Sequence, residues 1–153
     1  MPKFSERSES HLVTCDPRIV HVARMMIVHV DHSIICGRRG KIEQEDAVRT
    51  GMSRVHWPDG AHNCAVPDVT KPRQEWKEDT SALSRAFDFS TYPVDWDDEK
   101  QFCYVAGQYI ACARAEGIDL KWGGDWNRDG QGVWRDPKEK GALRDLGHLE
   151  LAG

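Results

Sequence analysis

The segment that largely decides the fold is residues 97–116, DDEKQFCYVAGQYIACARAE. Its apolar side chains recur three or four positions apart, which places them along one face of an α-helix. These side chains are Phe102, Val105, Ala106, Tyr109, Ile110 and Ala113. Gly117 follows and can end the helix, because glycine readily adopts the left-handed conformation found at helix C-termini. The spacing therefore predicts an amphipathic helix over 97–116 that buries one face against a core.

The sequence on either side predicts further helices and several short strands. Asp16 and Pro17 form an N-cap followed by proline at the first helical position, which predicts a helix over 17–29. Residues 41–49 are polar and helix-prone. Short runs with β-branched or alternating apolar residues predict strands at 32–36, 85–89, 120–122 and 148–151. This order predicts an α+β fold, with a small antiparallel sheet flanked by helices.

Residues 51–84 differ from the rest of the chain. They contain Pro58, Pro67 and Pro72 and show little periodicity, so we expect a long loop region of the kind that often carries function. The total length of 153 residues suits one hydrophobic core. We therefore expect a single domain over 1–153, with a loop insertion at about 63–84.

Composition and charge exclude several classes of protein. The 21 basic and 25 acidic residues are mixed along the chain and leave a net charge of only -4, so the sequence has no basic stripe for nucleic acid. No run of about 18 apolar residues occurs, and the N-terminal MPKFSERSES lacks the apolar centre of a secretory signal. We expect a protein made in the cytoplasm, with no stable membrane association and no nucleic-acid partner.

The five cysteines are odd in number and include no C-x-x-C pair. This pattern argues against both a disulfide framework and a thiolate zinc site. We expect reduced thiols that mostly serve packing.

The strongest local motif is Asp145-Leu-Gly-His148, which leads into the predicted strand at 148–151. A catalytic zinc needs about three nitrogen or oxygen ligands, an open position for water and a nearby carboxylate that accepts the proton of that water. His148 suits the role of a zinc ligand, and Asp145 suits the role of the carboxylate that accepts the proton. A surface aspartate beside a histidine is the alternative, because this short pattern is common by chance.

Six ordered blocks extend that motif into a resemblance over nearly the whole chain. They are residues 33–40 (SIICGRRG), 60–63 (GAHN), 86–89 (AFDF), 92–96 (YPVDW), 121–126 (KWGGDW) and 145–148 (DLGH). In this order they resemble phage L-alanyl-D-glutamate endolysins, which belong to the zinc D-Ala-D-Ala peptidases that include the vancomycin-resistance dipeptidases.

The resemblance implies a role for five residues. The family motifs S-x-H, A-x-D and D/E-x-x-H bind zinc, and they correspond here to His62, Asp88 and His148. The catalytic acid/base of the family corresponds to Asp145, and an arginine that steadies substrate and transition-state charge corresponds to Arg39.

The resemblance also implies a substrate and a place of action. The substrate would be a stem-peptide bond of peptidoglycan, either L-Ala-D-Glu or a bond that contains D-Ala. The enzyme would be a monomer that reaches the cell wall of the infected bacterium from the cytoplasm, after another agent has opened the membrane.

This sequence departs from the family pattern at two points. Gly60 replaces the serine of S-x-H, and 26 positions separate His62 from Asp88. A compact alternative therefore pairs His56 or His62 with Asp68. The surroundings of Asp68 are loop-like, which favours Asp88. A catalytically silent wall-binding module with the same fold is the alternative function.

One further loop suggests calcium. Asp125, Asn127 and Asp129 place oxygen-bearing side chains at alternate positions, and Gly130 stands at the sixth position, as in the first half of a calcium loop. The twelfth position holds Asp136 in place of the usual glutamate. An ordinary turn rich in Asp, Asn and Gly is the alternative interpretation.

Overall fold

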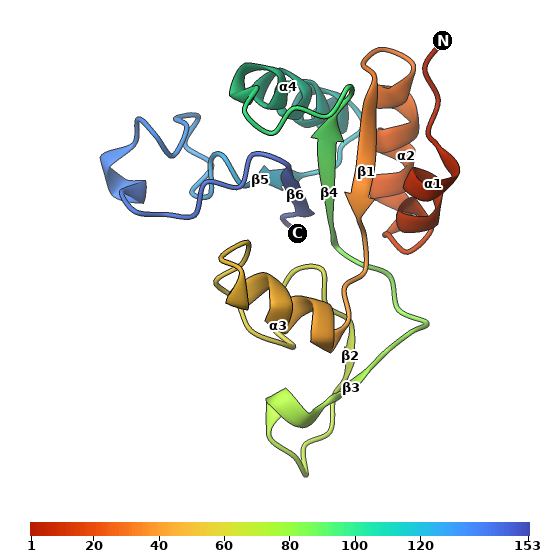
Figure 1. The fold of residues 1–153 in the computed structure, drawn as a ribbon, viewed down its shortest axis with the longest axis vertical. Coiled ribbons are helices and arrows are strands. Elements are labelled where there is room, and N and C mark those ends of the chain that lie inside the picture. The colour runs from red at the N-terminus through yellow and green to blue at the C-terminus, as the bar shows by residue number, and fades with distance from the viewer.

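A computed structural model describes all residues, 1–153. Figure 1 shows the arrangement of its helices and strands. The α-helices are α1 (Glu6–Leu12), α2 (Pro17–Ile27), α3 (Lys41–Arg49) and α4 (Glu99–Ala115), and the 3-10 turns are η1 (Arg73–Glu75) and η2 (Pro137–Glu139). The strands are β1 (His32–Cys36), β2 (Ala65–Val66), β3 (Lys77–Glu78), β4 (Ala86–Thr91), β5 (Leu120–Trp122) and β6 (His148–Leu151). The predicted α+β class with a small antiparallel sheet is confirmed.

The main sheet has the order β1-β4-β6-β5, and all its neighbours are antiparallel. Strands far apart in the sequence therefore meet at its centre, where β4 pairs with β6. Asp88 of β4 lies opposite His148 of β6, and Phe87 lies opposite Leu149. This register aligns the two strands on which the site is built.

Local signals set the ends of the two longest helices. The Asp16 side chain accepts a hydrogen bond from the backbone N–H of Arg18 at the start of α2, and Asp98 accepts one from Gln101 at the start of α4. Such caps satisfy N–H groups that have no partner inside the helix. Gly117 follows α4 with φ of 70°, as predicted.

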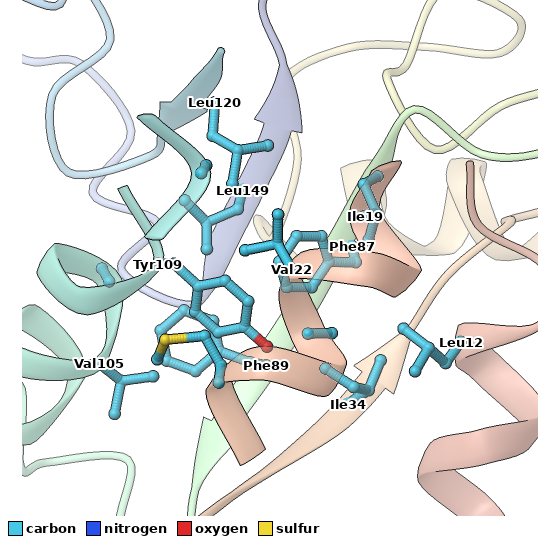
Figure 2. Close-up of a cluster of buried hydrophobic side chains, with 14 of the residues drawn as sticks. Leu12, Ile19, Val22, Ile34, Phe87, Phe89, Val105, Tyr109, Leu120 and Leu149 are labelled. Atoms are coloured by element: carbon cyan, nitrogen blue, oxygen red, sulfur yellow. The ribbon is translucent and has the colours of Figure 1, made fainter. Parts of the chain in front are cut away.

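The core lies between α2, α4 and one face of the sheet (Figure 2). Phe87, Phe89 and Leu149 are fully buried on that face. Successive residues of a strand point to opposite faces, so Asp88, His148 and Glu150 point to the other face. The packing of the aromatic core thereby fixes the positions of three polar residues.

One helix was not predicted from the sequence, and one local prediction was wrong. The polar N-terminus forms α1, where Ser5 caps the helix and Leu12 is buried completely. The region 51–84 is not an unbroken loop, because β2 and β3 form a small hairpin within it, seen below α3 in Figure 1. The buried indole of Trp57 donates a hydrogen bond to the carbonyl of Trp76 and ties this hairpin to the preceding loop.

None of the helices combines the length and apolar composition needed to span a membrane.

Candidate metal centre

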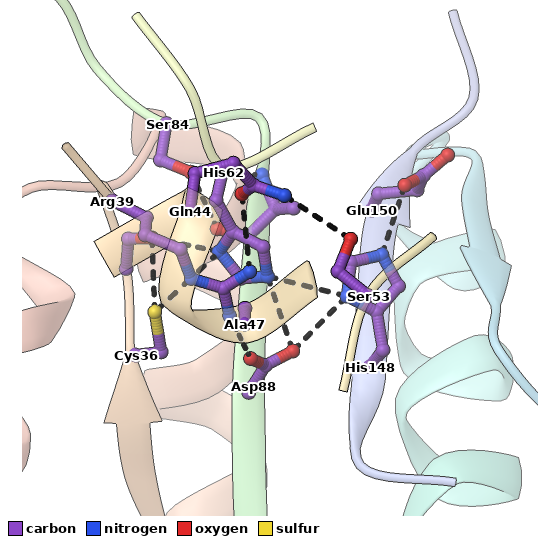
Figure 3. A network of polar contacts seen from close by, with 12 residues as sticks. Cys36, Arg39, Gln44, Ala47, Ser53, His62, Ser84, Asp88, His148 and Glu150 are labelled. Atoms are coloured by element: carbon purple, nitrogen blue, oxygen red, sulfur yellow. Dashed lines mark hydrogen bonds and ion pairs between the residues drawn. The ribbon is translucent and has the colours of Figure 1, made fainter. Parts of the chain in front are cut away.

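His62, Asp88 and His148 meet on the open face of the sheet (Figure 3). Nε2 of His62 lies 3.1 Å from Oδ1 of Asp88 and 3.2 Å from Nδ1 of His148. The third distance, between Nδ1 of His148 and Oδ1 of Asp88, is 3.0 Å. Ligand atoms about 2.0–2.2 Å from a tetrahedral zinc lie about 3.3–3.6 Å from one another. The three atoms thus have nearly the spacing of ligands around one ion.

Hydrogen bonds on the far side of each imidazole determine which nitrogen faces the other two residues. Nδ1 of His62 donates to the carbonyl of Gly37 at 2.7 Å, and Nε2 of His148 donates to Oε2 of Glu150 at 2.9 Å. In the neutral tautomers the opposite nitrogens then carry lone pairs, and both point at the carboxylate oxygen of Asp88. Three buried lone pairs that converge repel one another unless a cation lies among them, so these residues fit a metal ion.

The electrostatics of this group also favour positive charge. Burial disfavours the charged form of His62, but the charge of Asp88, together with the hydrogen bonds to Asp88 and Cys36, outweighs burial and raises the pKa of His62 to about 10. Burial also opposes ionisation of Asp88, yet His62 and His148 hold the pKa of Asp88 well below its ordinary range. A buried carboxylate that stays ionised between two histidines is suited to binding a cation.

Arg39 lies against the second oxygen of Asp88, with its guanidinium 3.0 Å from Oδ2. Only 13% of the Arg39 side chain is exposed. Its backbone N–H donates to the carbonyl of His62, and its own carbonyl accepts from the side chain of Asn63. The loop after β1 and the loop around His62 are therefore joined at the point where Arg39 enters the site.

Asp145 completes the group on the side facing Asp88 and His148. One of its carboxylate oxygens lies within 4.8 Å of a ligand atom of each of these residues. Burial and the charge of Asp88 raise the pKa of Asp145 to about 6. A half-buried carboxyl with a pKa near neutrality is suited to accept and return a proton, which is the role the resemblance assigns to Asp145.

Three residues of this cluster were not predicted from the sequence. Glu150 contacts His148, and Lys121 lies 2.6 Å from the other oxygen of Glu150. Spacing could have found Glu150, because it stands two positions after His148 and so shares its face of β6. Cys36, which we expected only to pack, offers its thiol within 4.8 Å of ligand atoms of His62 and Asp88 and lies 3.8 Å from Nδ1 of His62.

The compact alternative is not assembled in the structure. Oδ1 of Asp68 accepts hydrogen bonds from Thr70 in an exposed turn, and its other oxygen faces Lys71. His56 contacts Glu45 on the surface. The structure therefore brings Asp88, and not Asp68, to His62.

The predicted calcium loop is a compact turn. Asp125 accepts from the backbone N–H groups of Asp129 and Gly130, and Gly130 has φ of 85°. Asn127 donates through its side chain to Asp129 and to Asp136. The oxygen-bearing side chains at the first, third, fifth and twelfth positions therefore belong to one network.

Glu139 adds a carboxylate next to this turn. Its Oε1 accepts from the backbone N–H of Asn127, whereas its Oε2 is buried without a hydrogen-bond partner. The residue as a whole is 8% exposed. A buried carboxylate oxygen without a partner is rare in proteins and often indicates an ion or water.

The fold and the site together define a class of protein. It is a small α+β protein that holds two histidines, an ionised aspartate and a carboxyl of raised pKa on one face of an antiparallel sheet. This set of groups is typical of a metal-dependent hydrolase.

Comparisons with known proteins identify the family. Residues 1–152 match the family described as phage L-alanyl-D-glutamate peptidase, so the chain belongs to that family and is a peptidase. The L-alanyl-D-glutamate peptidase of Escherichia phage T5 is 27% identical over 154 residues, which cover 97% of each chain. The crystal structure of the Serratia marcescens L-Ala D-Glu endopeptidase ChiX has the same fold, with a TM-score of 0.62 and 23% identity over 98% of this chain and 90% of that chain. The resemblance carried by the six sequence blocks is confirmed.

Proposed function

We propose that the chain is a zinc-dependent endolysin that hydrolyses the L-Ala-D-Glu bond in the stem peptide of bacterial peptidoglycan. The observation that carries this proposal is the convergence of His62, Asp88 and His148 at 3.0–3.2 Å beside Asp145. The family and both relatives named above are described by this peptide bond, which favours it over a bond that contains D-Ala.

Zinc held by these three residues would supply Lewis acidity, polarising the scissile carbonyl and lowering the pKa of water. Asp145 then takes the proton of the attacking water and returns it to the leaving amine. Arg39, held beside Asp88, stabilises the negative charge that develops on the carbonyl oxygen. Each of these roles needs the buried geometry described above.

The metal should be zinc, with two imidazole nitrogens and one carboxylate as its ligands. The thiol of Cys36 lies on the Nδ1 side of His62, and that nitrogen already donates to Gly37. We therefore assign Cys36 to the surroundings of the ligand and not to the metal itself.

We also propose that calcium binds at the turn around Asp125, Asn127 and Asp129. The unpartnered Oε2 of Glu139 and the carboxylate of Asp136 supply further oxygens of the type that calcium prefers. The side chains of this turn interact mainly with one another and with backbone N–H groups. An ion would therefore bind carboxylates that the fold already holds close together.

The proposed enzyme would act as a monomer on the cell wall, once another agent has opened the membrane of the infected bacterium. Its partner would be the peptidoglycan stem peptide, with no nucleic acid involved.

The test is to incubate zinc-loaded protein with purified peptidoglycan and to identify the newly released amino termini. We expect D-glutamate at the new termini for the wild type, and about 10²- to 10⁴-fold slower release for Asp145→Asn with zinc retained. Zinc-loaded wild type that binds the wall but releases no termini would instead support a silent wall-binding module. New amino termini on D-Ala would instead show that the enzyme cleaves a bond that contains D-Ala.

A further inference from the structure

A cleft runs across the candidate centre and has two unlike halves. Arg39, Met52, Leu143 and Asp145 line both halves, so the two meet over the proposed acid/base. Beyond this junction, the apolar half is lined by Ile35, Trp96, Phe102 and Leu146. The polar half is lined by Arg54, His62, Lys121 and His148. A peptide whose scissile bond lies at Asp145 has room for one side in each half.

The charges in the two halves are not equivalent. In the apolar half, Arg144 and Glu99 form an ion pair with each other. In the polar half, Lys121 pairs with Glu150 and Arg39 pairs with Asp88. Arg54 has no acidic partner, and its guanidinium donates only to the backbone carbonyl of Gly141, at 2.6 Å. The polar half thus contains one arginine whose charge no carboxylate of the protein neutralises.

Arg54 is nevertheless held in place. Its hydrogen bond to Gly141 joins the loop after α3 to the loop before Asp145. A guanidinium carries five N–H donors, so most of them remain free for a ligand. Arginine binds carboxylates well because two parallel N–H groups match the two carboxylate oxygens.

The apolar half offers a different surface. The indole of Trp96 stacks on Phe102 with ring centroids 5.8 Å apart, yet the residue is 61% exposed. Met52 lines this half as well as the polar half. An exposed indole held by a buried aromatic ring offers apolar surface to a ligand without the cost of ordering a mobile side chain.

The chemistry of the proposed substrate has the same asymmetry. D-glutamate has two carboxyl groups, and whichever one is linked in the peptide, the other is a free carboxylate. L-alanine on the opposite side of the bond has only a methyl group. We propose, on the basis of the function proposed above, that the cleft binds its substrate in one direction. The free carboxylate of D-glutamate lies on Arg54 in the polar half, and the alanyl side lies against Met52 and Trp96.

The experiment compares two peptides that contain the L-Ala-D-Glu bond and differ only in that the free carboxylate of one is converted to an amide. The ratio of their kcat/KM values, measured with zinc-loaded protein, reports recognition of the carboxylate. A charge-assisted hydrogen bond corresponds to about a 10- to 100-fold preference, which we expect for the wild type. Arg54→Gln should reduce this ratio about tenfold or more, and Arg54→Lys should keep part of it.

Arg49→Gln is the matched control. Arg49 lies five residues earlier, its side chain is 72% exposed and pairs with Asp46, and it lines neither half of the cleft. Its variant should keep the full ratio. Because one variant cleaves both peptides, a loss of folded protein lowers both rates equally and leaves the ratio unchanged.

The outcomes separate this inference from the proposed function. If Arg54→Gln keeps the preference of the wild type, or if the wild type cleaves both peptides equally, the role of Arg54 is overturned while the peptidase stands. If the zinc-loaded wild type cleaves neither peptide, the proposed function and this inference fail together.

Discussion

Asp88 and His148 lie directly opposite each other on β4 and β6, with Oδ1 of Asp88 3.0 Å from Nδ1 of His148. The neighbouring residues Phe87 and Leu149 form the next register pair and point into the core on the other face of the sheet. The pairing of β4 with β6 therefore positions both the core residues on one face of the sheet and the polar pair on the other. His62 joins them from a separate loop, and the carbonyl of Gly37, which follows β1, orients the His62 ring.

Glu150 should tune the affinity of the centre for zinc. Its carboxylate accepts from Nε2 of His148 and so holds the ring with Nδ1 facing Asp88. Removing such a partner typically weakens metal binding about 10- to 100-fold, and we expect a loss in this range for Glu150→Gln. A competition titration against a chelator measures it. Glu116→Gln, which removes a surface carboxylate next to His21, is the control and should bind zinc like the wild type.

Gly123 should be essential for the position of Asp145. A Cβ at residue 123 would overlap the backbone carbonyl of Asp145, and the two residues also share a backbone hydrogen bond of 3.1 Å. Gly123→Ala should therefore cost about 1–3 kcal/mol of unfolding free energy and lower kcat by displacing the carboxylate. Gly107→Ala in α4 is the matched control, because a Cβ there meets nothing within 4 Å. The control should stabilise the helix by up to about 1 kcal/mol. Equal effects of the two substitutions would contradict this explanation.

Stability should fall in mild acid because of His32. Its Nδ1 donates to the carbonyl of Val30, and its Nε2 is hydrogen-bonded to the buried hydroxyl of Tyr109. Burial lowers the pKa of His32, so the unfolded chain binds a proton more readily than the folded one. The contribution of His32 is complete above the ordinary histidine range near pH 6.5 and is lost as the pH falls below it.

Denaturant unfolding of the wild type and His32→Gln, at about pH 7.5 and about pH 5, tests this prediction. The difference between the two pH values should be smaller in the variant. The exposed His29→Gln should behave like the wild type. A variant of His32 that lost as much stability in acid as the wild type would rule out this residue as the source.

Calcium should stabilise the protein through the turn at Asp125. A ligand that binds only the folded state raises stability by about 2.7 kcal/mol at 100 times its dissociation constant. We expect millimolar calcium to raise the Tm of the zinc-loaded wild type, and Glu139→Gln to reduce that rise because it replaces one of the carboxylate oxygens. Magnesium, which demands a smaller octahedral site, should have a weaker effect. A calcium response identical in both proteins would place the ion elsewhere.

The sequence predicted those elements that have a strong period or a strong cap. The helix at 97–116 is α4, and the helix at 17–29 is α2, in each case with ends within about two residues of those observed. The polar helix α1 was missed because it buries only Ser8 and Leu12, which gives no apolar stripe. The hairpin of β2 and β3 has two residues in each strand, too few to show an alternating pattern.

The resemblance predicted which residues form the candidate site, but it did not predict how they contact one another or which residues surround them. The spacing of His62 and Asp88 says nothing about their contact, which depends on how a loop folds onto β4. Cys36 reaches them through its register with Asp88 across a bulge in β1, and no pattern in the sequence indicates that bulge. The shared network of Asp136 and Glu139 likewise appears only in three dimensions.

The zinc content of purified protein, measured for the wild type and for His62→Ala, Asp88→Ala and Asp68→Ala, tests the central claim most directly. Asp68→Ala removes an exposed carboxylate from the same region of the chain and serves as the matched control. We expect one zinc per chain in the wild type and in Asp68→Ala, and a loss of zinc in the other two variants. A wild type without zinc affinity, or an Asp88→Ala variant that binds zinc as tightly as the wild type, would contradict the centre described here.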